Sequence, residues 1–259
     1  MAAINPYKGP VDVQIRSELP FDAEITTQNL RMTPIKEDAQ TIDEWADLSG
    51  DPDVMRLYMN GSLRTRDQSA GRVKVLAKRF LDGDPFSAYR VSDKTTGAFL
   101  GMVNVGHGDI PGESQMAGFG LKAFWKKGYG KEAATAMVHG LMPEVVKRGV
   151  LLEKEPLREI IATAHSENGA SNRILQDLGM KYIKSANLHG GIRNYYAIQV
   201  AEMGMEKLAL KQSAAPGISA PAPEKRLSCF MRICKSLQSL FRLWINWLRK
   251  ACCPLGAVF

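Results

Sequence analysis

The hydrophobic period of this chain changes at about residue 86, and the change limits the folds that the chain can adopt. Upstream, the apolar residues of 66–81 recur at helical spacing and predict a helix. Downstream, three apolar segments are typical of consecutive strands: Phe86–Val91, Phe99–Val105 and Gln115–Leu121. A turn-type composition at residues 92–97 joins the first two of these strands.

Helices and strands alternate on either side of these three strands. Before them we expect a strand at about 24–33 and a helical region at about 36–59, broken between Gly50 and Pro52. After them we expect, in order, a helix from about Tyr129, a strand at Glu159–Ala164, a short helix at 171–178, and closing strands near 180–188 and 193–200. This order predicts an α/β (α+β) fold with a mixed sheet flanked by helices.

A segment rich in proline and alanine, residues 211–223, separates this body from a chemically different tail. From Glu224 onward, seven basic residues accompany a single acidic one. All four cysteines also lie in this stretch: Cys229, Cys234, Cys252 and Cys253. We therefore divide the chain into an N-terminal arm at 1–22, a domain at 23–205, a linker at 206–224 and a basic tail at 225–259.

The distribution of charged residues, cysteines and histidines excludes several classes of protein. The net charge of +7 lies mostly in the tail, so we expect no nucleic-acid-binding face on the body. The cysteines rule out a disulfide-stapled body, and the four histidines are too widely separated to suggest a metal site. No apolar run is long enough for a membrane-spanning helix, and residues 1–20 carry charges within any signal-peptide core. We therefore expect a cytoplasmic protein.

The segment that carries chemistry follows the third strand of the meander. Gly128 and Gly130 stand at a strand-to-helix junction, where glycine lets the backbone approach a ligand and the helix presents free N–H groups. The helix dipole and Lys126, Lys127 and Lys131 favour an anion there, and phosphate is the natural guest. The alternative is an ordinary glycine loop with solvated lysines, because so short a glycine pattern is a weak signal.

Three longer patterns make the assignment more specific. The run Gly118–Ala133 is followed by Asn168–Asn172 and by a Leu-Gly-Met sequence at 178–180, and Asn29–Pro34 precedes them all. Together they resemble the GNAT family of N-acetyltransferases, and within it the branch that acetylates the N-termini of ribosomal proteins. The resemblance covers about residues 24–200. It implies a mostly antiparallel sheet, acetyl-CoA as cosubstrate and an amine-bearing acceptor, either a protein or a small molecule.

The resemblance also implies roles for individual residues. The end of the strand at Leu121 and Ala123 would pair with the pantetheine arm, and the backbone of the following loop would hold the pyrophosphate. Asn168 and Ser171 match the Asn-x-x-Ser positions beside the thioester. The full set that it assigns to cofactor binding is Leu121, Ala123, Lys126, Lys127, Gly128, Tyr129, Gly130, Lys131, Asn168 and Ser171. Trp125 departs from the Gln or Arg that often opens this loop.

Acyl transfer to an amine needs a neutral amine and an acid for the departing thiolate, and several residues compete for these roles. Base candidates are Glu113, Asp109 and His165, each of which could equally be an ordinary loop acid or a polar residue closing a strand. Acid candidates are Ser171, which is also a common helix-start residue, and Tyr195 or Tyr196. Strand alternation expects one of these two tyrosines to be in the core.

The tail predicts a second functional feature. Its apolar residues fall three or four apart on one helical stripe and its basic residues on the opposite one, so residues 225–253 predict an amphipathic helix. Such a helix suits peripheral binding to an anionic membrane, with nearby cysteines as acylation sites. It could instead dock on the body, on a second copy in a homodimer, or in a calmodulin-like groove. Two functions therefore remain open: a membrane-held acetyltransferase, or a catalytically inactive acyl-CoA-binding adaptor.

Overall fold

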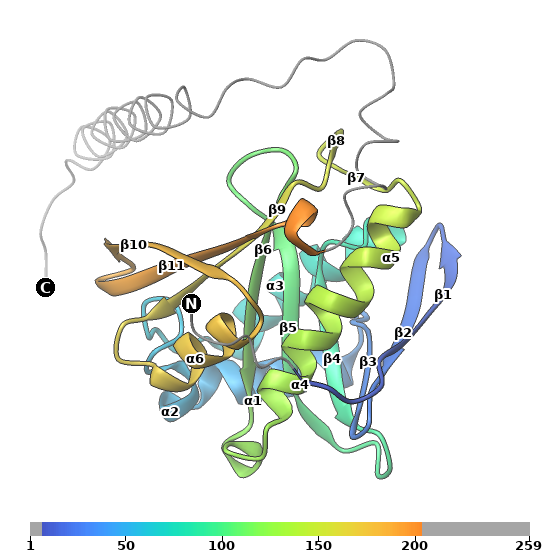
Figure 1. Cartoon of the computed structure of the whole chain (residues 1–259). Helices are drawn as coiled ribbons and strands as arrows, with labels where there is room; N and C mark the ends of the chain where they lie inside the picture. Colours follow the sequence, from blue (N-terminus) through green and yellow to red (C-terminus); the bar gives the residue numbers. More distant parts are fainter. Residues whose placement is uncertain (1–6, 204–259) are drawn as a thin grey trace, which may run out of the picture. The chain divides into compact units, whose positions relative to one another are not determined.

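The computed structural model describes residues 7–203. The predicted linker at 206–224 and amphipathic tail at 225–259 lie outside the described residues. The body formed by residues 7–203 is coloured along the sequence in Figure 1.

A nine-stranded sheet organises the body, and only one of its strand pairs is parallel. In spatial order its strands are β1 (Asp12–Glu18), β2 (Phe21–Thr26), β3 (Leu30–Pro34), β4 (Ala88–Asp93), β5 (Phe99–His107), β6 (Glu113–Gly120), β9 (Glu159–His165), β11 (Gly191–Gln199) and β10 (Lys181–Leu188). The parallel pair is β6 with β9, because a long helical crossover connects these two strands. The short strands β7 (Leu151–Leu152) and β8 (Glu155–Pro156) form a separate hairpin within that crossover. The predicted mixed, mostly antiparallel sheet is confirmed.

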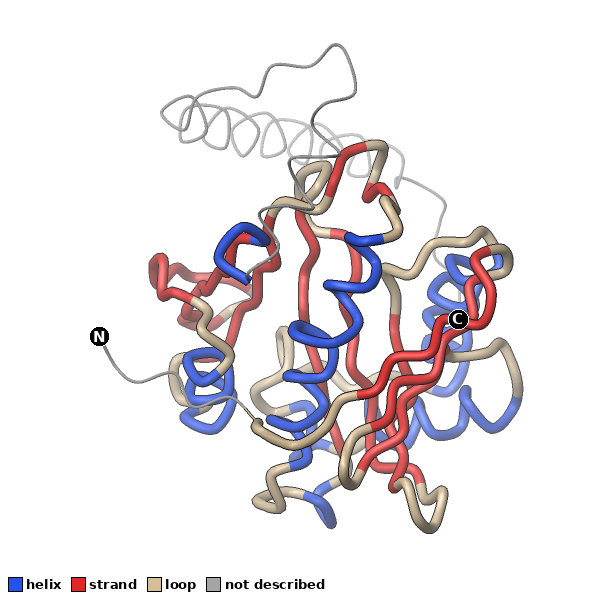
Figure 2. The backbone as a smooth tube through the Cα atoms, turned by 45° about the vertical axis from the view of Figure 1, so that its right-hand side comes forward, coloured by secondary structure: helices blue, strands red, loops and turns tan. Residues whose placement is uncertain are grey.

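Helices cover both faces of this sheet. They are α1 (Ala39–Gly50), α2 (Pro52–Met55), α3 (Arg66–Leu81), α4 (Tyr129–Thr135), α5 (Met142–Lys147) and α6 (Gly169–Asp177). Between α4 and α5 the helix continues through a π-helical turn, η2 (Ala136–Leu141), and short 3-10 turns stand at η1 (Lys122–Phe124) and η3 (Val200–Met203). The run from α4 to α5 crosses one face of the sheet, and α1 and α3 lie on the other (Figures 1 and 2).

The apolar core lies between these helices and the sheet. Leu48 and Leu76 bring the α1–α3 layer into it, and Met137 and Leu141 bring the α4–α5 run, all four without exposed surface. The helix predicted at 66–81 is confirmed at both ends. Thr65 begins it with a capping box, in which its side chain accepts a hydrogen bond from Gln68 N and its own N–H donates to the Gln68 side chain.

The N-terminal part of the sheet corrects two expectations. Residues 12–18, assigned to a loosely attached arm, form the edge strand β1, which pairs with β2. Only Val13 and Ile15 of this edge strand are apolar. They alternate with polar residues and pack against the core, but the alternation is short. The single strand expected at 24–33 is two strands, β2 and β3, separated by a turn in which Thr27 N donates to Leu30 O (2.9 Å).

Candidate active site

Strands β6 and β9 pair along only part of their length. Their parallel register runs from Glu113 beside Glu159 to Met116 beside Ala162, and no register pair follows within residues 7–203. Beyond that point β6 stays paired with β5 up to Gly120, and β9 stays paired with β11 up to His165. The two strands therefore diverge, and backbone groups along their facing edges are left for another partner. We call this gap the β6–β9 slot.

The chain leaves β6 through η1 and turns into α4 at Gly128. This glycine has φ +84°, in the left-handed region, and it precedes the helix without any side-chain cap. The first hydrogen bond of the helix joins Glu132 N to Gly128 O (3.0 Å). The N–H groups of residues 129–131 precede that bond and are the free donors of the helix start. A β-carbon at Gly128 would meet nothing within 4 Å, so the backbone is open here.

The lysines of this loop differ in their surroundings. Lys131 donates to Asp177 Oδ2 of α6 (3.0 Å), and this bond is the main cause that lowers the pKa of the Asp177 carboxyl. The Lys131 ammonium therefore connects α4 to α6 through this ion pair. Lys126 and Lys127 are exposed, and Lys127 Nζ lies 5.0 Å from the centre of the Phe124 ring. Neither lysine forms an ion pair among the described residues.

Trp125 has a defined structural role at the end of β6. Its indole N–H donates to Gly120 O (2.9 Å), and Leu121 N donates to Leu100 O (2.9 Å). The strand thus ends at Gly120, and η1 takes up Lys122–Phe124. Leu121 and Ala123, which the resemblance assigns to pantetheine pairing, lie beyond the strand, whereas the edge that is not paired with β9 is that of residues 117–120, with Gly120 O occupied by Trp125.

On the β9 side of the slot, α6 begins at a cluster of asparagines. The Asn168 side chain accepts a hydrogen bond from Ser171 N (3.0 Å) and caps the helix. Asn172 connects more elements. Its Nδ2 donates to His165 O (2.9 Å) and Asn168 O (2.7 Å), while its Oδ1 accepts from Tyr196 Oη (2.9 Å) and from the Asn194 side chain (2.9 Å). Sequence reasoning included Asn172 in the Asn168–Asn172 run but gave it no role.

The acid candidates now separate by their surroundings. Tyr196 is only 3% exposed and its hydroxyl donates to Asn172, whereas Tyr195 is half-buried with Lys184 Nζ 5.1 Å from its ring centre. The expected core tyrosine is therefore Tyr196. The hydroxyl of Ser171 has no hydrogen-bond partner among residues 7–203, and its residue is half-buried at the start of α6. Ser171 keeps a proton that it can give to a ligand.

The surroundings of His165 and Glu113 do not favour either residue as the general base. His165 Nδ1 accepts a hydrogen bond from Glu167 N (3.2 Å), so the proton of the neutral ring is on Nε2 and the basic lone pair is occupied. Glu113 Oε1 accepts from Asp109 N (2.9 Å) at the paired end of β6. It stands four residues, or about 13 Å of strand, before Ala117 at the start of the slot.

Glu132, in the first turn of α4, ties the loop to the sheet. It is 4% exposed, and its carboxylate accepts from Thr27 Oγ1 (2.5 Å), Asn29 N (2.9 Å) and Asn29 Nδ2 (3.0 Å). Three donors to one buried carboxylate make a strong connection. The start of α4 is therefore fixed to the β2–β3 turn.

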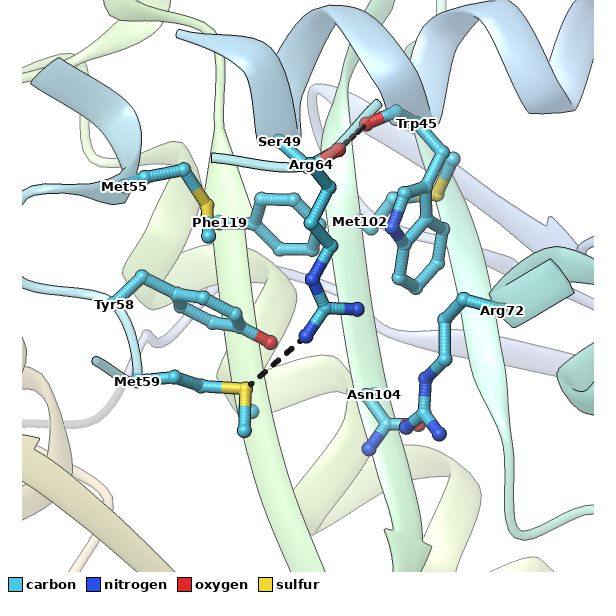
Figure 3. A pocket seen from close by; sticks show the side chains of 11 residues that line it. Trp45, Ser49, Met55, Tyr58, Met59, Arg64, Arg72, Met102, Asn104 and Phe119 are labelled. Carbon is cyan, nitrogen blue, oxygen red and sulfur yellow. Dashed lines mark hydrogen bonds between the residues drawn. The ribbon is translucent and has the colours of Figure 1, made fainter. Parts of the chain in front are cut away.

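A cavity of about 160 Å³ lies on the opposite side of the sheet from α4 (Figure 3). Its walls are Trp45 and Ser49 of α1, Met55 of α2, Tyr58, Met59 and Arg64 of the following loop, Arg72 of α3, Met102 and Asn104 of β5, and Ala117 and Phe119 of β6. Ala117 and Phe119 belong to the stretch of β6 that borders the β6–β9 slot. The cavity therefore adjoins the slot across a single strand, and we call it the arginine pocket.

Comparison with known proteins identifies this arrangement. The sequence model of the acetyltransferase (GNAT) domain matches residues 29–181, more than half of the chain. The chain belongs to the GNAT acetyltransferase family. A search of curated proteins returned no match.

Solved GNAT structures share the fold at low sequence identity. A GNAT acetyltransferase from Bacillus anthracis superimposes with a TM-score of 0.54 at 21% identity, over 68% of this chain and 98% of that one. A ribosomal-protein-alanine acetyltransferase from Vibrio fischeri gives 0.53 at 13% identity, over 68% and 96%. A ribosomal-protein α-N-acetyltransferase in complex with coenzyme A gives 0.52 at 13% identity, over 68% and 96%.

The described part of this GNAT chain has neither a metal-binding cluster nor a spanning helix. Residues 7–203 contain no group of three or more His, Cys, Asp or Glu side chains that could hold a metal ion. Within that range no helix has the length and apolar character to cross a membrane.

Proposed function

We propose that this GNAT protein transfers an acetyl group from acetyl-CoA, held in the β6–β9 slot, to an amine that enters from the arginine pocket. The observation that supports this most is the end of pairing at Met116 and Ala162. It leaves a strand edge beside the wall formed by Ala117 and Phe119. A donor and an acceptor bound on the two sides of this strand would meet at one point.

The slot fits the cosubstrate by the chemistry of its groups. The amides of residues 127–131 suit the pyrophosphate, because the first N–H groups of a helix favour anions. The free edge of residues 117–120 suits the amide groups of pantetheine, which need backbone partners. Asn168 and Ser171 would border the thioester end. Acetyl-CoA supplies an activated acyl group, and the protein has to position the amine and protonate the thiolate.

Ser171 is the residue that we assign to the proton transfer. Its hydroxyl is free within the described residues, whereas that of Tyr196 is committed to Asn172. Tyr196 then acts as a positioning residue, since it holds the asparagine that anchors the start of α6. The geometry around His165 and Glu113 does not favour either as base, so we infer that the amine reaches the site neutral or loses its proton to water.

The decisive test is acetyl-CoA consumption by the full chain with a panel of protein N-termini, lysine peptides and small amines. An active enzyme releases coenzyme A in proportion to acetylated product. The alternative function, an inactive acyl-CoA-binding adaptor for a membrane or a partner, requires binding of coenzyme A by calorimetry without turnover on any amine. A protein that neither binds coenzyme A nor consumes acetyl-CoA would refute both.

A protein N-terminus is the acceptor class that we favour. Two of the structural neighbours bear names of ribosomal-protein acetyltransferases, one of them an α-N-acetyltransferase, although identities of 13% support the fold alone. The absence of a carboxylate among the residues that line the arginine pocket points the same way. An α-amine, with an ordinary pKa near 8, needs less help to become neutral than a lysine with a pKa near 10.4.

For residues 225–253 we propose peripheral binding to anionic membranes. The sequence supports this, because a basic helix with an apolar stripe lies flat at an interface and cations at the bilayer centre are costly. Sedimentation with phosphatidylserine vesicles, at low and high salt, compares the full chain with a protein that ends at Pro223. If the full chain ignores the vesicles while the shortened protein loses stability or dissociates from a homodimer, the tail belongs to the fold instead.

A further inference from the structure

The arginine pocket concentrates positive charge that no acidic residue balances. Among residues 7–203, neither Arg64 nor Arg72 forms an ion pair, and both side chains point into the space in front of Asn104 (Figure 3). Most arginines elsewhere in the body do have acidic partners, such as Arg90 with Glu44 (2.6 Å) and Arg66 with Asp43 (2.6 Å). Arg56 and Arg79 also lack an ion pair among the described residues, but this cavity brings two unpaired guanidinium groups together in one wall.

A third arginine adds to this charge from behind the cavity wall. Arg193 of β11 is 6% exposed and donates only to neutral oxygens: Thr163 Oγ1 (3.1 Å), Thr163 O (3.2 Å), Met59 O (3.3 Å) and Leu57 O (3.4 Å). Burial lowers the pKa of its guanidinium. A buried charge without a counter-ion is costly, and a bound anion would reduce that cost.

Two further polar side chains line the cavity, Tyr58 with a hydroxyl donor and Asn104 with an acceptor oxygen that is unsatisfied within residues 7–203. The Tyr58 ring stacks on Phe119 with centroids 4.7 Å apart. Burial raises the pKa of the Tyr58 phenol even though the fields of Arg72, Arg64 and Arg193 act to lower it. The phenol therefore stays protonated near neutral pH and can donate. Asn104 Oδ1, buried and without a hydrogen-bond partner in the described part of the chain, is the unsatisfied polar atom beside them.

We propose that the arginine pocket binds a carboxylate of the acceptor, close to the amine that is acetylated. The pocket offers guanidinium and phenol donors, which match a carboxylate in charge and geometry. Its volume of about 160 Å³ is below the roughly 300–1,000 Å³ of pockets that enclose drug-sized ligands. It suits one acidic group, either the side chain of an acidic N-terminal residue or the carboxylate of a free amino acid. This inference rests on the proposed acetyltransferase activity.

The same charges would act on the amine itself. A positive neighbour disfavours a second positive charge, so an ammonium group entering this field has a lowered pKa. An α-amine beside the arginines would then be largely neutral at physiological pH, without a carboxylate base in the cavity. The acceptor carboxylate and the reactive amine are thus selected by one set of residues.

The test uses the full chain, acetyl-CoA and peptides that differ only in their first residue, which is Glu, Gln or Lys, together with free alanine and alaninamide, which differ only in the α-carboxylate. We expect kcat/KM for the Glu peptide over the Gln peptide, or for alanine over alaninamide, to be higher by about tenfold or more, because hydrogen bonds to charged groups are strong. Preference within the peptide pair or within the free pair identifies the source of the carboxylate.

Substitutions in α3 test whether the arginine pocket causes the preference for the Glu peptide over the Gln peptide. Arg72→Gln should reduce the Glu-to-Gln ratio toward one, and Arg72→Glu should shift it toward the Lys peptide. The matched control is Arg66→Gln on the same helix, which removes only an exposed ion pair and should leave the ratio unchanged. Melting temperatures establish that each variant is folded.

Calorimetry with the N-acetylated Glu and Gln peptides supplies a readout that needs no turnover. Tighter binding of the acidic peptide, lost in Arg72→Gln, supports the inference even if catalysis fails. Equal binding or equal kcat/KM for acidic and neutral acceptors overturns it, while leaving the acetyltransferase activity in place. Failure to bind coenzyme A or to acetylate any acceptor counts instead against the proposed function.

Discussion

Two glycines at the start of α4 should respond to the same substitution in opposite ways. Gly128 has φ +84° and open space around a built β-carbon, so Gly128→Ala is strained by the backbone alone. Gly130 lies inside the first turn of α4, where a β-carbon would stand 3.5 Å from Ile174 Cδ1, an ordinary contact. Only the first substitution should turn the amides away from the pyrophosphate.

The magnitudes follow from this geometry. A left-handed conformation costs an L-residue roughly 1–2 kcal/mol. Part of this, about 0.4–1 kcal/mol, is offset because alanine restricts the unfolded chain. Gly128→Ala should therefore lose about 1 kcal/mol, or about 2–4 °C in Tm for a domain of this size. Gly130→Ala should gain up to about 1 kcal/mol, since alanine favours the helix.

The affinity for coenzyme A shows whether the strained loop also binds the cosubstrate. Rotation of even one amide away from the pyrophosphate removes a hydrogen bond to a charged group, about 1.5–3 kcal/mol, so Gly128→Ala should weaken coenzyme A binding tenfold or more. Gly97→Ala is the matched control, because Gly97 has φ +73° and open space in the β4–β5 turn. Calorimetry on folded variants decides. Wild-type affinity in Gly128→Ala would refute the assignment of the loop.

Three further results are expected. Ser171→Ala should lower turnover about a hundredfold with little change in acetyl-CoA affinity, whereas Tyr196→Phe should cost about 1 kcal/mol of stability and affect turnover less, as kinetics and urea unfolding would reveal. Glu132→Gln should destabilise the domain by about 1–3 kcal/mol in urea, because an amide N–H would face donors. The pKa of Asp177 is lowered, so the stabilising effect of its carboxylate exists above about pH 4 and is lost on acidification. The difference in free energy of unfolding between the wild type and Asp177→Asn should therefore be smaller at pH 3 than at pH 6.

Local signals explain which parts of the fold were predictable. The helix at 66–81 has its own capping box, and α4 begins at Tyr129, between two closely spaced glycines. The break between α1 and α2 follows from Pro52, and Asp51 caps the second helix. These features depend on residues within one turn of each other. The edge strand β1 depends instead on its pairing with β2, and its own sequence offers only a short alternation, at Val13 and Ile15.

The site was predictable only where it is local. The loop at 126–131 and the Asn168–Ser171 cap are short motifs, and the structure places both beside the β6–β9 slot. The slot itself depends on the parallel pairing of β6 with β9, two strands separated by the whole α4–α5 crossover. A local hydrophobic period cannot predict a pairing over that distance. The arginine pocket draws on α1, α2, α3, β5 and β6, so its composition follows from the fold. Arg193 likewise gave no signal in the strand pattern.

One strand links both halves of the proposed reaction through two properties of β structure. Backbone groups of a strand point along the sheet, while alternate side chains point to its opposite faces. In the stretch after Met116, the edge of β6 faces the slot, and Ala117 and Phe119 face the arginine pocket. The cosubstrate would therefore be recognised by main-chain groups of this strand and the acceptor by side chains of the alternate residues, because Ala117 and Phe119 pair through their own backbones with β5. Acceptor preference can thus vary through the pocket side chains while the strand edge that binds acetyl-CoA stays unchanged.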